Sequence, residues 1–552
     1  MNRWLLAAAL LMGCAGFATA DYIIIVANVG TEKELNTLAG AMPGAYPGAP
    51  GMPAAGMPAA GMPAAGGALP TSANALPTSA SSGGMRGGRR AMGGMTGMPG
   101  MPRMPGMPGM PGVYGPTGPT DVDDVPYFII AVVEVKPVGK GKSSEVGKQM
   151  MKGLARVNLT DRLGEGYSKN PVYLLNKTSF GEVHVLTGND GKPVPTVQQQ
   201  FAKKFEGLKD KSSASDILRL AKWTLSHGLI GEFPKVMDKL VESNKDAPAA
   251  VAYRKVKGDL EKAAARDDAS VAQLKKALGT SYRDVSGPHY TLFHSSAIPA
   301  VDVKSRLDQL ENSFRGFYYW FALKGVALTA PSHRQLVVLT NSDKDFEQFQ
   351  EVLTAGPVVV DGFFARRENL AVLSSQRQDE SYDSLSKYYE TWEGKGLRRA
   401  DVLLRKPKPA ELADGGKTFA EAQMLSVMLR ALEKEAELAT VSHDASRQLL
   451  FASGLLPRNV AAPEWLLFGM GSFFETPLQS PWPSLGAPSA YYLPRWNEMK
   501  GKGFEKTPGQ TLRKVITDAY FRSVPPEGKS GSEERRAHDD AVRKARTASW
   551  SL

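Results

Sequence analysis

The stretch TVSHDASRQLLFASGLLPRNVAAPEWLLFGMGSFFE, residues 440–475, decides the fold class of this chain. Its apolar side chains recur with a helical period from about Thr440 to Gly454, and Pro457 follows the glycine. A glycine followed by a proline is typical of a helix end, and Pro463 is placed to begin another helix. We therefore expect a helix, a loop and a second helix.

The first of these helices resembles a zinc-binding motif in its spacing, but two of the three residues that define the motif are replaced. In an HExxH helix the two histidines lie one turn apart on one face and bind zinc, and the glutamate activates the bound water. Here the same five positions, residues 443–447, read HDASR. The second helix begins with PEWLLFGMG, residues 463–471, which resembles the pattern P-x-W-L-x-E-G-x-A, whose glutamate is a third metal ligand.

These motifs resemble a secreted bacterial family of unknown function that has a peptidase-MA-like, gluzincin-type domain. The resemblance covers about residues 281–552. It rests on the His443 helix, the phrase RQLLFASGLLPR, the PEWL helix followed by FFE, and the strand–helix–strand order from His289 to Phe349. It implies a peptidase-like α+β fold for this part of the chain.

Carried over position by position, the resemblance makes His443 the first zinc ligand and Asp444 the general base. Arg447 then takes the place of the second ligand and Phe468 that of the third. A guanidinium is permanently charged and offers no lone pair, and a phenyl ring has no donor atom. Asp444 is shorter than glutamate by one carbon–carbon bond, about 1.5 Å, and a misplacement of that size can cost about a hundredfold in rate. Because catalytic zinc needs three protein ligands, we expect no catalytic residue, no metal and no cofactor.

Two carboxylates on the second helix leave alternatives open. Glu464 and Glu475 lie four residues before and seven residues after the third-ligand position. A zinc site of His443, Asp444 and one of these glutamates is conceivable, although it is poor in nitrogen. The interpretation that we favour is an ion pair of Arg447 with a neighbouring carboxylate, which cross-links the helices in place of the metal, because a buried charge must be paired. A cleft in which Arg447 holds an anionic ligand is the remaining alternative.

The N-terminus predicts export. Residues 1–20 have a basic start, an apolar run too short to span a bilayer, and a small-residue cleavage site before Asp21. The tetrapeptide LMGC, ending at Cys14, resembles a lipobox, so a lipid-anchored form is the alternative; Cys14 is the single cysteine. An uncleaved anchor that includes the apolar run at 22–26 ranks last. We expect a periplasmic or extracellular protein.

Low-complexity sequence follows the signal. GMPAA occurs three times between residues 51 and 65, and residues 97–112 read GMPGMPRMPGMPGMPG. Such a composition cannot bury enough apolar surface to offset chain entropy, so we expect a disordered Pro/Gly/Met-rich linker over residues 21–124. The sequence RGGRR at 86–90 resembles an RNA-binding box, but in an exported chain a solvated basic linker fits better, and we expect no nucleic-acid partner.

Two regions separate the linker from the peptidase-like part. Residues 125–210 contain β-rich runs and turn signals, and they predict a small β or α+β module. Residues 213–280 have apolar side chains at a helical period and predict tetratricopeptide-like helix pairs without a clean repeat. We expect this region to be a helical spacer; a protein-interaction scaffold is the alternative.

Within residues 281–552, local patterns predict the elements: a strand at 287–295, a helix at 303–321, a strand and the start of a helix at 334–349, and a hairpin at 358–374 that turns at 366–369. Thr418 and Glu421 have the spacing of a capping box, which predicts one helix from there and another from about Thr440. Residues 511–521 predict one short helix.

The last predicted helix begins at a capping box of Ser530 and Glu533, and its apolar face continues to Leu552, as if the sequence were truncated. Motifs for acyl transfer, nucleotide binding and thiol redox chemistry have no support in the sequence. The net charge of +11 favours anionic partners weakly.

We therefore predict a multi-domain α+β protein: a disordered linker, a small β-containing module, a helical spacer and a C-terminal gluzincin-like domain. The predicted function is that of a non-catalytic exported pseudopeptidase that binds an unknown protein or an envelope polymer. A zinc-dependent metallopeptidase with a non-standard ligand set and a helical-repeat interaction scaffold are the alternatives.

Overall fold

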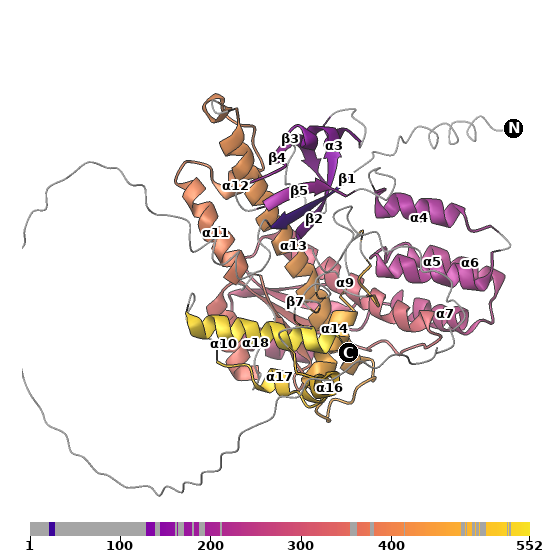
Figure 1. Ribbon diagram of the computed structural model, residues 1–552. Helices are drawn as coiled ribbons and strands as arrows, with labels where there is room; N and C mark the ends of the chain where they lie inside the picture. The colour runs from indigo at the N-terminus through magenta and orange to yellow at the C-terminus, as the bar shows by residue number, and fades with distance from the viewer. Residues whose placement is uncertain are drawn as a thin grey trace, which may run out of the picture. The chain divides into compact units, whose positions relative to one another are not determined.

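The computed structural model (Figure 1) describes residues 21–27, 129–138, 144–160, 163, 170–178, 181–186, 194–209, 212–353, 362–375, 380–412, 415–475, 481, 483–487, 492, 496, 499, 504–526, 528 and 532–551. The predicted signal at 1–20 with Cys14, and the low-complexity segment at 28–128, lie outside the described residues. The described chain is mixed α+β, as the sequence predicts, with two five-stranded sheets.

The first sheet is antiparallel and has the order β4-β3-β2-β1-β5. Its strands are β1 (Asp21–Ala27), β2 (Ile129–Pro137), β3 (Leu154–Leu159), β4 (Val172–Leu175) and β5 (Gly181–Val185), and α3 (Ser144–Met151) packs on it. The prediction that the linker begins at residue 21 is wrong for 21–27, because β1 lies between β2 and β5. Ile23 and Ile25 are buried in one apolar core, and Tyr22, on the opposite face of the strand, is buried in another.

Strands β1 and β2 are antiparallel neighbours although about a hundred residues separate them in the sequence. Val26 is paired with Ile129, so the last residues of β1 and the first residues of β2 lie at the same end of this strand pair. The low-complexity sequence is therefore an insertion between two neighbouring strands.

Helices dominate the next part of the chain, as predicted for residues 213–280. They are α4 (Val197–Glu206), α5 (Ala214–Ser226), α6 (Phe233–Ser243), α7 (Pro248–Leu260) and α8 (Asp268–Leu278). Phe233 and Tyr253 contact Tyr319 of α9 (Ala300–Leu323), and helices α5 to α7 share one apolar core with α9. These helices therefore pack onto the C-terminal part of the chain, whereas the sequence predicts a spacer.

The second sheet has the order β6-β7-β8-β10-β9, in which β7, β8 and β10 are parallel. Its strands are β6 (Tyr282–Ser286), β7 (Tyr290–Ser295), β8 (Gln335–Thr340), β9 (Gly362–Ala365) and β10 (Leu370–Ser374). Helix α9 connects β7 to β8, and α10 (Asp343–Leu353) follows β8. The predicted strands, helices and hairpin of residues 287–374 are confirmed where the structure describes them, and positions 358–361 of the hairpin lie outside the described residues. Asn369 lies in the hairpin turn with a φ of 52°.

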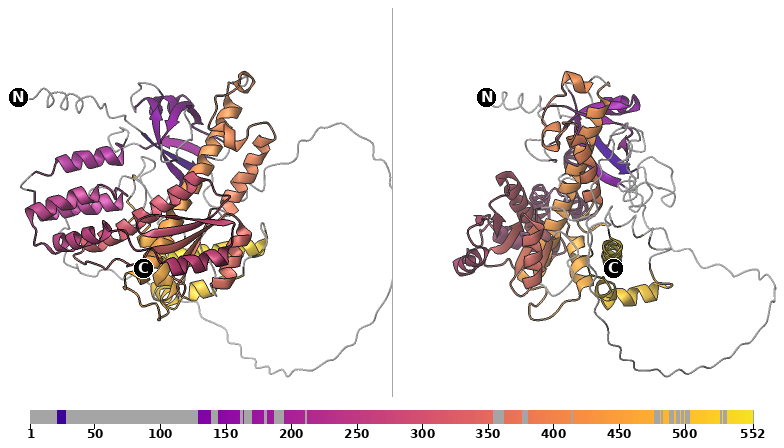
Figure 2. Two further views of the ribbon diagram at one scale, coloured as in Figure 1. Left: turned by 180° about the vertical axis from the view of Figure 1, so that it is seen from behind. Right: turned by 90° about the vertical axis from the view of Figure 1, so that its left-hand side faces the viewer.

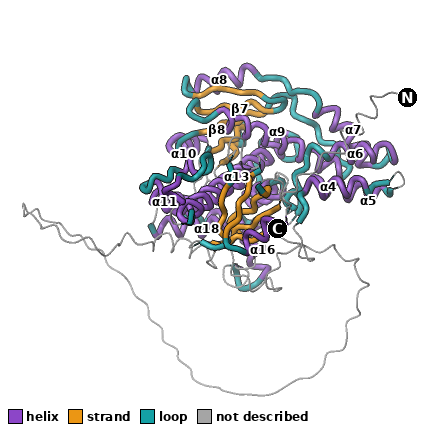
Figure 3. The backbone as a smooth tube through the Cα atoms, turned by 90° about the horizontal axis from the view of Figure 1, so that it is seen from above, coloured by secondary structure: helices purple, strands orange, loops and turns teal. Residues whose placement is uncertain are grey.

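Helices cover both faces of this sheet (Figure 3). Successive side chains of a strand point to opposite faces, so the strands contribute to two apolar cores. One set packs with residues of α8 and α10: Phe293, Val338, Phe363 and Val372. The opposite set faces the core shared with α9 and α13: Leu292, Val337, Leu339 and Leu373.

Helix α13 (Lys417–Ala452) is one continuous helix of 36 residues that contacts both sheets (Figure 2). Two predictions are therefore wrong: a break near Thr440, and a capping box at Thr418. The N-cap is Gly416, with a φ of 77° and no side-chain cap. No glycine or proline interrupts the helix, and the Ser442 hydroxyl donates back to the carbonyl of Leu438 at 2.6 Å, so this serine does not end the helix.

The C-terminal helices form a small apolar cluster around Phe468. They are α14 (Glu464–Phe473), α16 (Pro508–Ile516), α17 (Ala519–Arg522) and α18 (Glu533–Trp550). The single helix predicted at 511–521 is two helices, because Asp518 takes a left-handed φ of 55° between them. The cap of α18 is Ser532, whose hydroxyl accepts from the Arg535 amide, and Ser530 lies outside the described residues. No described helix combines the length and the apolar character that crossing a bilayer requires.

Candidate functional site

Helix α13 places three of the candidate residues in the interior of the protein. His443 is 1% exposed, Asp444 is 0% exposed and Arg447 is 7% exposed. Their spacing puts them on one side of the helix, against α14 and strand β9. A methyl group at Gly362 of β9 would collide with the Asp444 carboxylate, so only glycine allows this strand to approach so closely.

The His443 ring is covered by α14. Its centroid lies 4.7 Å from that of the Phe468 ring, the residue that the resemblance puts at the third-ligand position. A methyl group at Gly471 would lie 2.7 Å from both Cε1 and Nε2 of His443, so the glycine lets the backbone of α14 lie directly on the imidazole. Nε2 of His443 has no hydrogen-bond partner among the described residues.

Arg447 joins the two helices through carboxylates. One guanidinium nitrogen lies 3.6 Å from Oδ1 of Asp444, on the same helix, and the other donates to Oε2 of Glu464 on α14 at 3.1 Å. Asp444 is completely buried, whereas the Glu464 side chain is half exposed. The guanidinium therefore neutralises a buried carboxylate and ties it to the start of the next helix.

Glu475 pairs with His443, with 3.3 Å between Oε1 and Nδ1. Burial raises the pKa of Glu475 to about 8; Arg546 opposes this shift and Asp444 adds to it. Burial also holds the pKa of His443 well below its usual value, and the cations of Arg447 and Arg546 lower it further. At pH 7 both groups are therefore neutral, and the contact of Nδ1 with the carboxyl group joins two uncharged partners.

The structure thus brings together all six candidate residues: His443, Asp444, Arg447, Glu464, Phe468 and Glu475. The two glutamates go to different partners, Glu464 to Arg447 and Glu475 to His443. Within the described ranges, no group of three His, Asp or Glu side chains is placed to hold a metal ion.

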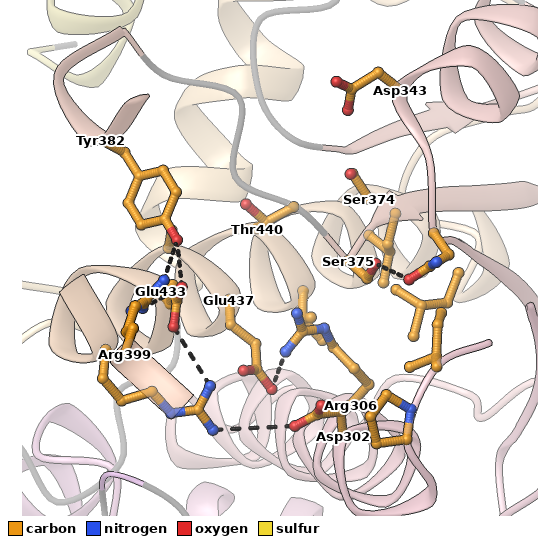
Figure 4. Close-up of a pocket in the computed structure, with 18 of the residues that line it drawn as sticks. Asp302, Arg306, Asp343, Ser374, Ser375, Tyr382, Arg399, Glu433, Glu437 and Thr440 are labelled. Atoms are coloured by element: carbon orange, nitrogen blue, oxygen red, sulfur yellow. Dashed lines mark hydrogen bonds and ion pairs between the residues drawn. The ribbon is translucent and has the colours of Figure 1, made fainter. Parts of the chain in front are cut away.

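Sequence analysis missed a cavity of about 710 Å³ beside α13 (Figure 4). It lies at the carboxyl ends of β8 and β10, where Leu339 and Ser374 line it, and α9, α11 (Glu380–Glu393), α12 (Arg399–Val402) and α13 complete its wall. The polar residues that directly follow the strands, at 341–343 and 374–375, were the available signal, because parallel strands bring their carboxyl ends together.

The charged side chains that line this cavity form ion pairs with each other and with Lys434, which is not itself part of the lining. Glu437 pairs with Arg306 and with Lys434, the latter at 2.8 Å, and Glu433 accepts from Arg399 at 2.6 Å. Burial lowers the pKa of Lys434 to about 8, with Arg430 and Arg306 as further causes. Most of the charged side chains in this wall are thus already paired with each other.

One comparison with known proteins gives a match. The family model described as "Protein of unknown function (DUF1570)" matches residues 437–532, which include the end of α13, all of α14 and the Arg447 ion pairs. The matched segment is similar to a family of unknown function. No curated protein and no solved structure matches the chain.

Proposed function

We propose that this protein is a non-catalytic pseudopeptidase, with a binding or structural role in the cell envelope. The peptidase part of this proposal is supported by the resemblance of residues 281–552 to peptidase-MA-like domains. Its location in the envelope is supported by the export signal predicted at residues 1–20. In this proposal the helix pair α13 and α14 keeps the scaffold of a metallopeptidase and has exchanged its metal for an ion pair.

The Arg447 ion pair is the observation that carries the proposal. A metal ligand must offer a lone pair, and a guanidinium offers none. Its charge is satisfied by Asp444 and Glu464, so a cation would have to compete with a guanidinium that is already paired. Phe468 places a ring where the family pattern has a carboxylate, and the imidazole of His443 lies under α14.

Elemental analysis and a peptidase assay of the purified full chain test this proposal. We expect no stoichiometric zinc after dialysis against zinc and no peptide hydrolysis above that of an Asp444→Asn variant. One zinc ion per chain that is lost in His443→Ala, with hydrolysis that is lost in Asp444→Asn, would establish the metallopeptidase alternative instead.

The metallopeptidase alternative has one observation in its favour: Glu475 lies 3.3 Å from Nδ1 of His443, close enough to share a ligand. It requires Glu475 to lose its proton and Arg447 to leave Asp444. Both changes leave charge in a buried place, which is costly, so we prefer the non-catalytic function.

A further inference from the structure

The cavity beside α13 is separate from the His443 cluster. None of the six candidate residues lines it, and its volume of about 710 Å³ lies within the range of small-molecule sites. It opens at the carboxyl ends of β8 and β10, the position at which open parallel sheets bind ligands.

The lining of the cavity has an excess of negative charge. It contains five carboxylates and three guanidinium groups, a formal charge of −2, in a chain whose net charge is +11. The carboxylates belong to Asp302, Asp343, Glu393, Glu433 and Glu437, and the guanidinium groups to Arg306, Arg399 and Arg430.

The guanidinium groups are held by neighbours. Arg306 pairs with Glu437, and Arg399 donates to Glu433 at 2.6 Å and to the Tyr382 hydroxyl at 3.0 Å. Arg430 donates to the carbonyl of Leu163 at 3.1 Å and lies 3.5 Å from Glu433. An anionic ligand would have to displace these contacts.

Asp302 is held less tightly. Its carboxylate lies 4.0 Å from Arg430, and its side chain is 36% exposed at the start of α9. A carboxylate with one distant partner can still accept hydrogen bonds from a cation, because each of its oxygens has two acceptor positions.

Thr440 supplies a second, independent feature. It is 8% exposed, and its hydroxyl group has no hydrogen-bond partner in the described part of the chain. In Figure 4 its side chain stands out from α13 into the space between Tyr382 and Ser374. A hydroxyl group that lines the cavity can donate a hydrogen bond to a bound polar ligand or accept one from it. The apolar part of the wall comes from Leu339, Leu373 and Val441.

We propose that this cavity binds an organic cation, a ligand with an ammonium or guanidinium group on an aliphatic body. Asp302 accepts from the cationic group, Thr440 contacts a polar group of the ligand, and the apolar wall packs against its methylene groups. Such a cation can be a lysine or arginine side chain of a peptide or a free polyamine. The proposal uses no residue of the His443 cluster and is independent of the proposed function.

Calorimetric titration of the full chain tests the proposal with three probes: spermidine, acetyl-Ala-Lys-Ala-amide and, as the anionic control, acetyl-Ala-Glu-Ala-amide. We expect saturable binding of at least one cationic probe, weakened by salt, and no binding of the anionic peptide. Binding of the lysine peptide identifies a peptide source, and binding of spermidine alone identifies a free amine; both support the proposal.

Two variants and a matched control locate the site. Asp302→Asn should weaken binding by about tenfold, because it removes a charge-assisted hydrogen bond, and Thr440→Val should weaken it less. Asp308→Asn, on the same helix but outside the cavity lining and 58% exposed, should leave the affinity unchanged. The proposal is overturned if neither cationic probe saturates by about 10 mM, a very weak affinity, or if the folded Asp302→Asn variant binds as the native protein does.

Discussion

A single side chain, Arg447, changes what the α13–α14 helix pair can do. The guanidinium brings its own positive charge into the interior, where Asp444 is completely buried. A zinc ion would require neutral or anionic ligands around it, whereas arginine requires only carboxylates. The Arg447 guanidinium is thus a cation that lies between the two helices and is paired with a carboxylate from each.

Truncating this side chain should destabilise the protein strongly. In Arg447→Ala, Asp444 is left as a buried charge without its cation, and breaking such a pair typically costs about 3–5 kcal/mol. We expect the free energy of unfolding, measured by urea denaturation, to fall by that order. Arg458→Ala, an exposed position in the loop before α14, is the control and should change it little. An Arg447→Ala protein as stable as the native protein would show that the ion pair does not hold the helices.

Glu475 should make stability depend on pH. Its pKa is about 8 in the folded protein and near 4.5 when unfolded, so between these values the unfolded chain has released a proton that the folded chain keeps. The free energy of unfolding therefore falls as the pH rises through this range. His443 acts in the opposite sense below its ordinary pKa of 6.5, because there only the unfolded chain takes up a proton.

Between pH 6.5 and 8, comparison with a variant that lacks the carboxyl group isolates the contribution of Glu475, because His443 and Lys434 titrate alike in both proteins. Across this range, the native protein should lose up to about 2 kcal/mol relative to Glu475→Gln, a variant that has no carboxyl group to titrate. Urea denaturation at several pH values measures the difference. The free energy of unfolding of Glu368→Gln, a change at an exposed position, should depend on pH as that of the native protein does. Parallel curves for the native protein and Glu475→Gln would mean that the buried carboxyl group is ionised throughout.

The residue types of this site were predictable, and most of their partners were not. The spacing of residues 443–447 and the PEWL helix indicated which side chains meet, because both are local patterns. The ion pair of Arg447 with a neighbouring carboxylate was also predicted, and it is confirmed with Asp444 and Glu464. Which glutamate pairs with Arg447 and which with His443 depends on how α14 lies on α13, which no local pattern contains.

At the scale of elements, the N-terminus of α14 is capped by a residue more distant in the sequence, Asp518. The N-cap of α14 is Pro463, which gives no side-chain cap, and the Asp518 carboxylate accepts from the amides of Glu464 and Trp465 at 3.1 and 2.9 Å. Asp518 itself has a φ of 55°, where aspartate and asparagine are better tolerated than most residues. One side chain thus caps α14 and makes the turn between α16 and α17.

Substitutions at this position separate the two roles. Asp518→Asn should lie between the native protein and Asp518→Gly, because it keeps the backbone conformation but only one of the two acceptor oxygens. Asp518→Gly should cost about 1 kcal/mol for the lost cap, and Asp518→Ala should cost about 1–2 kcal/mol more because of left-handed strain. Thermal unfolding of the three variants checks this order. Equal stability of the glycine and asparagine variants would mean that the carboxylate contributes no cap.

The continuity of α13 shows why sequence patterns misplace helix ends. Serine and threonine favour caps and turns, so Thr440 and Ser442 suggest a boundary. In the folded chain the hydroxyls of Ser442 and Ser446 donate to carbonyls of the preceding turn, and tertiary packing against two sheets decides the conformation. By contrast, the strands and helices from β7 to β10 were predictable, because their apolar periods and turn residues are local.

At the scale of the whole molecule, β1 is the element that the sequence concealed. From the sequence, a short apolar run next to a predicted cleavage site does not reveal which strands it pairs with. Its neighbour β2 follows only after the whole low-complexity segment. Cleavage before Asp21 would leave all of β1 in the chain. The first sheet would then begin with the first residues of the exported protein.

Because Val26 is paired with Ile129, the segment 28–128 should be dispensable for folding. Replacing it with an Asn-Gly turn of about four residues joins strands that are already neighbours, and loop-closure entropy predicts a gain of up to about 3 kcal/mol. We expect the shortened protein to unfold cooperatively at a melting temperature equal to or above the native one. Ile25→Asp, which places a charge on a fully buried strand residue, should destabilise the shortened and the full-length protein equally. A shortened chain that fails to fold, or one indifferent to Ile25→Asp, would place β1 outside the sheet.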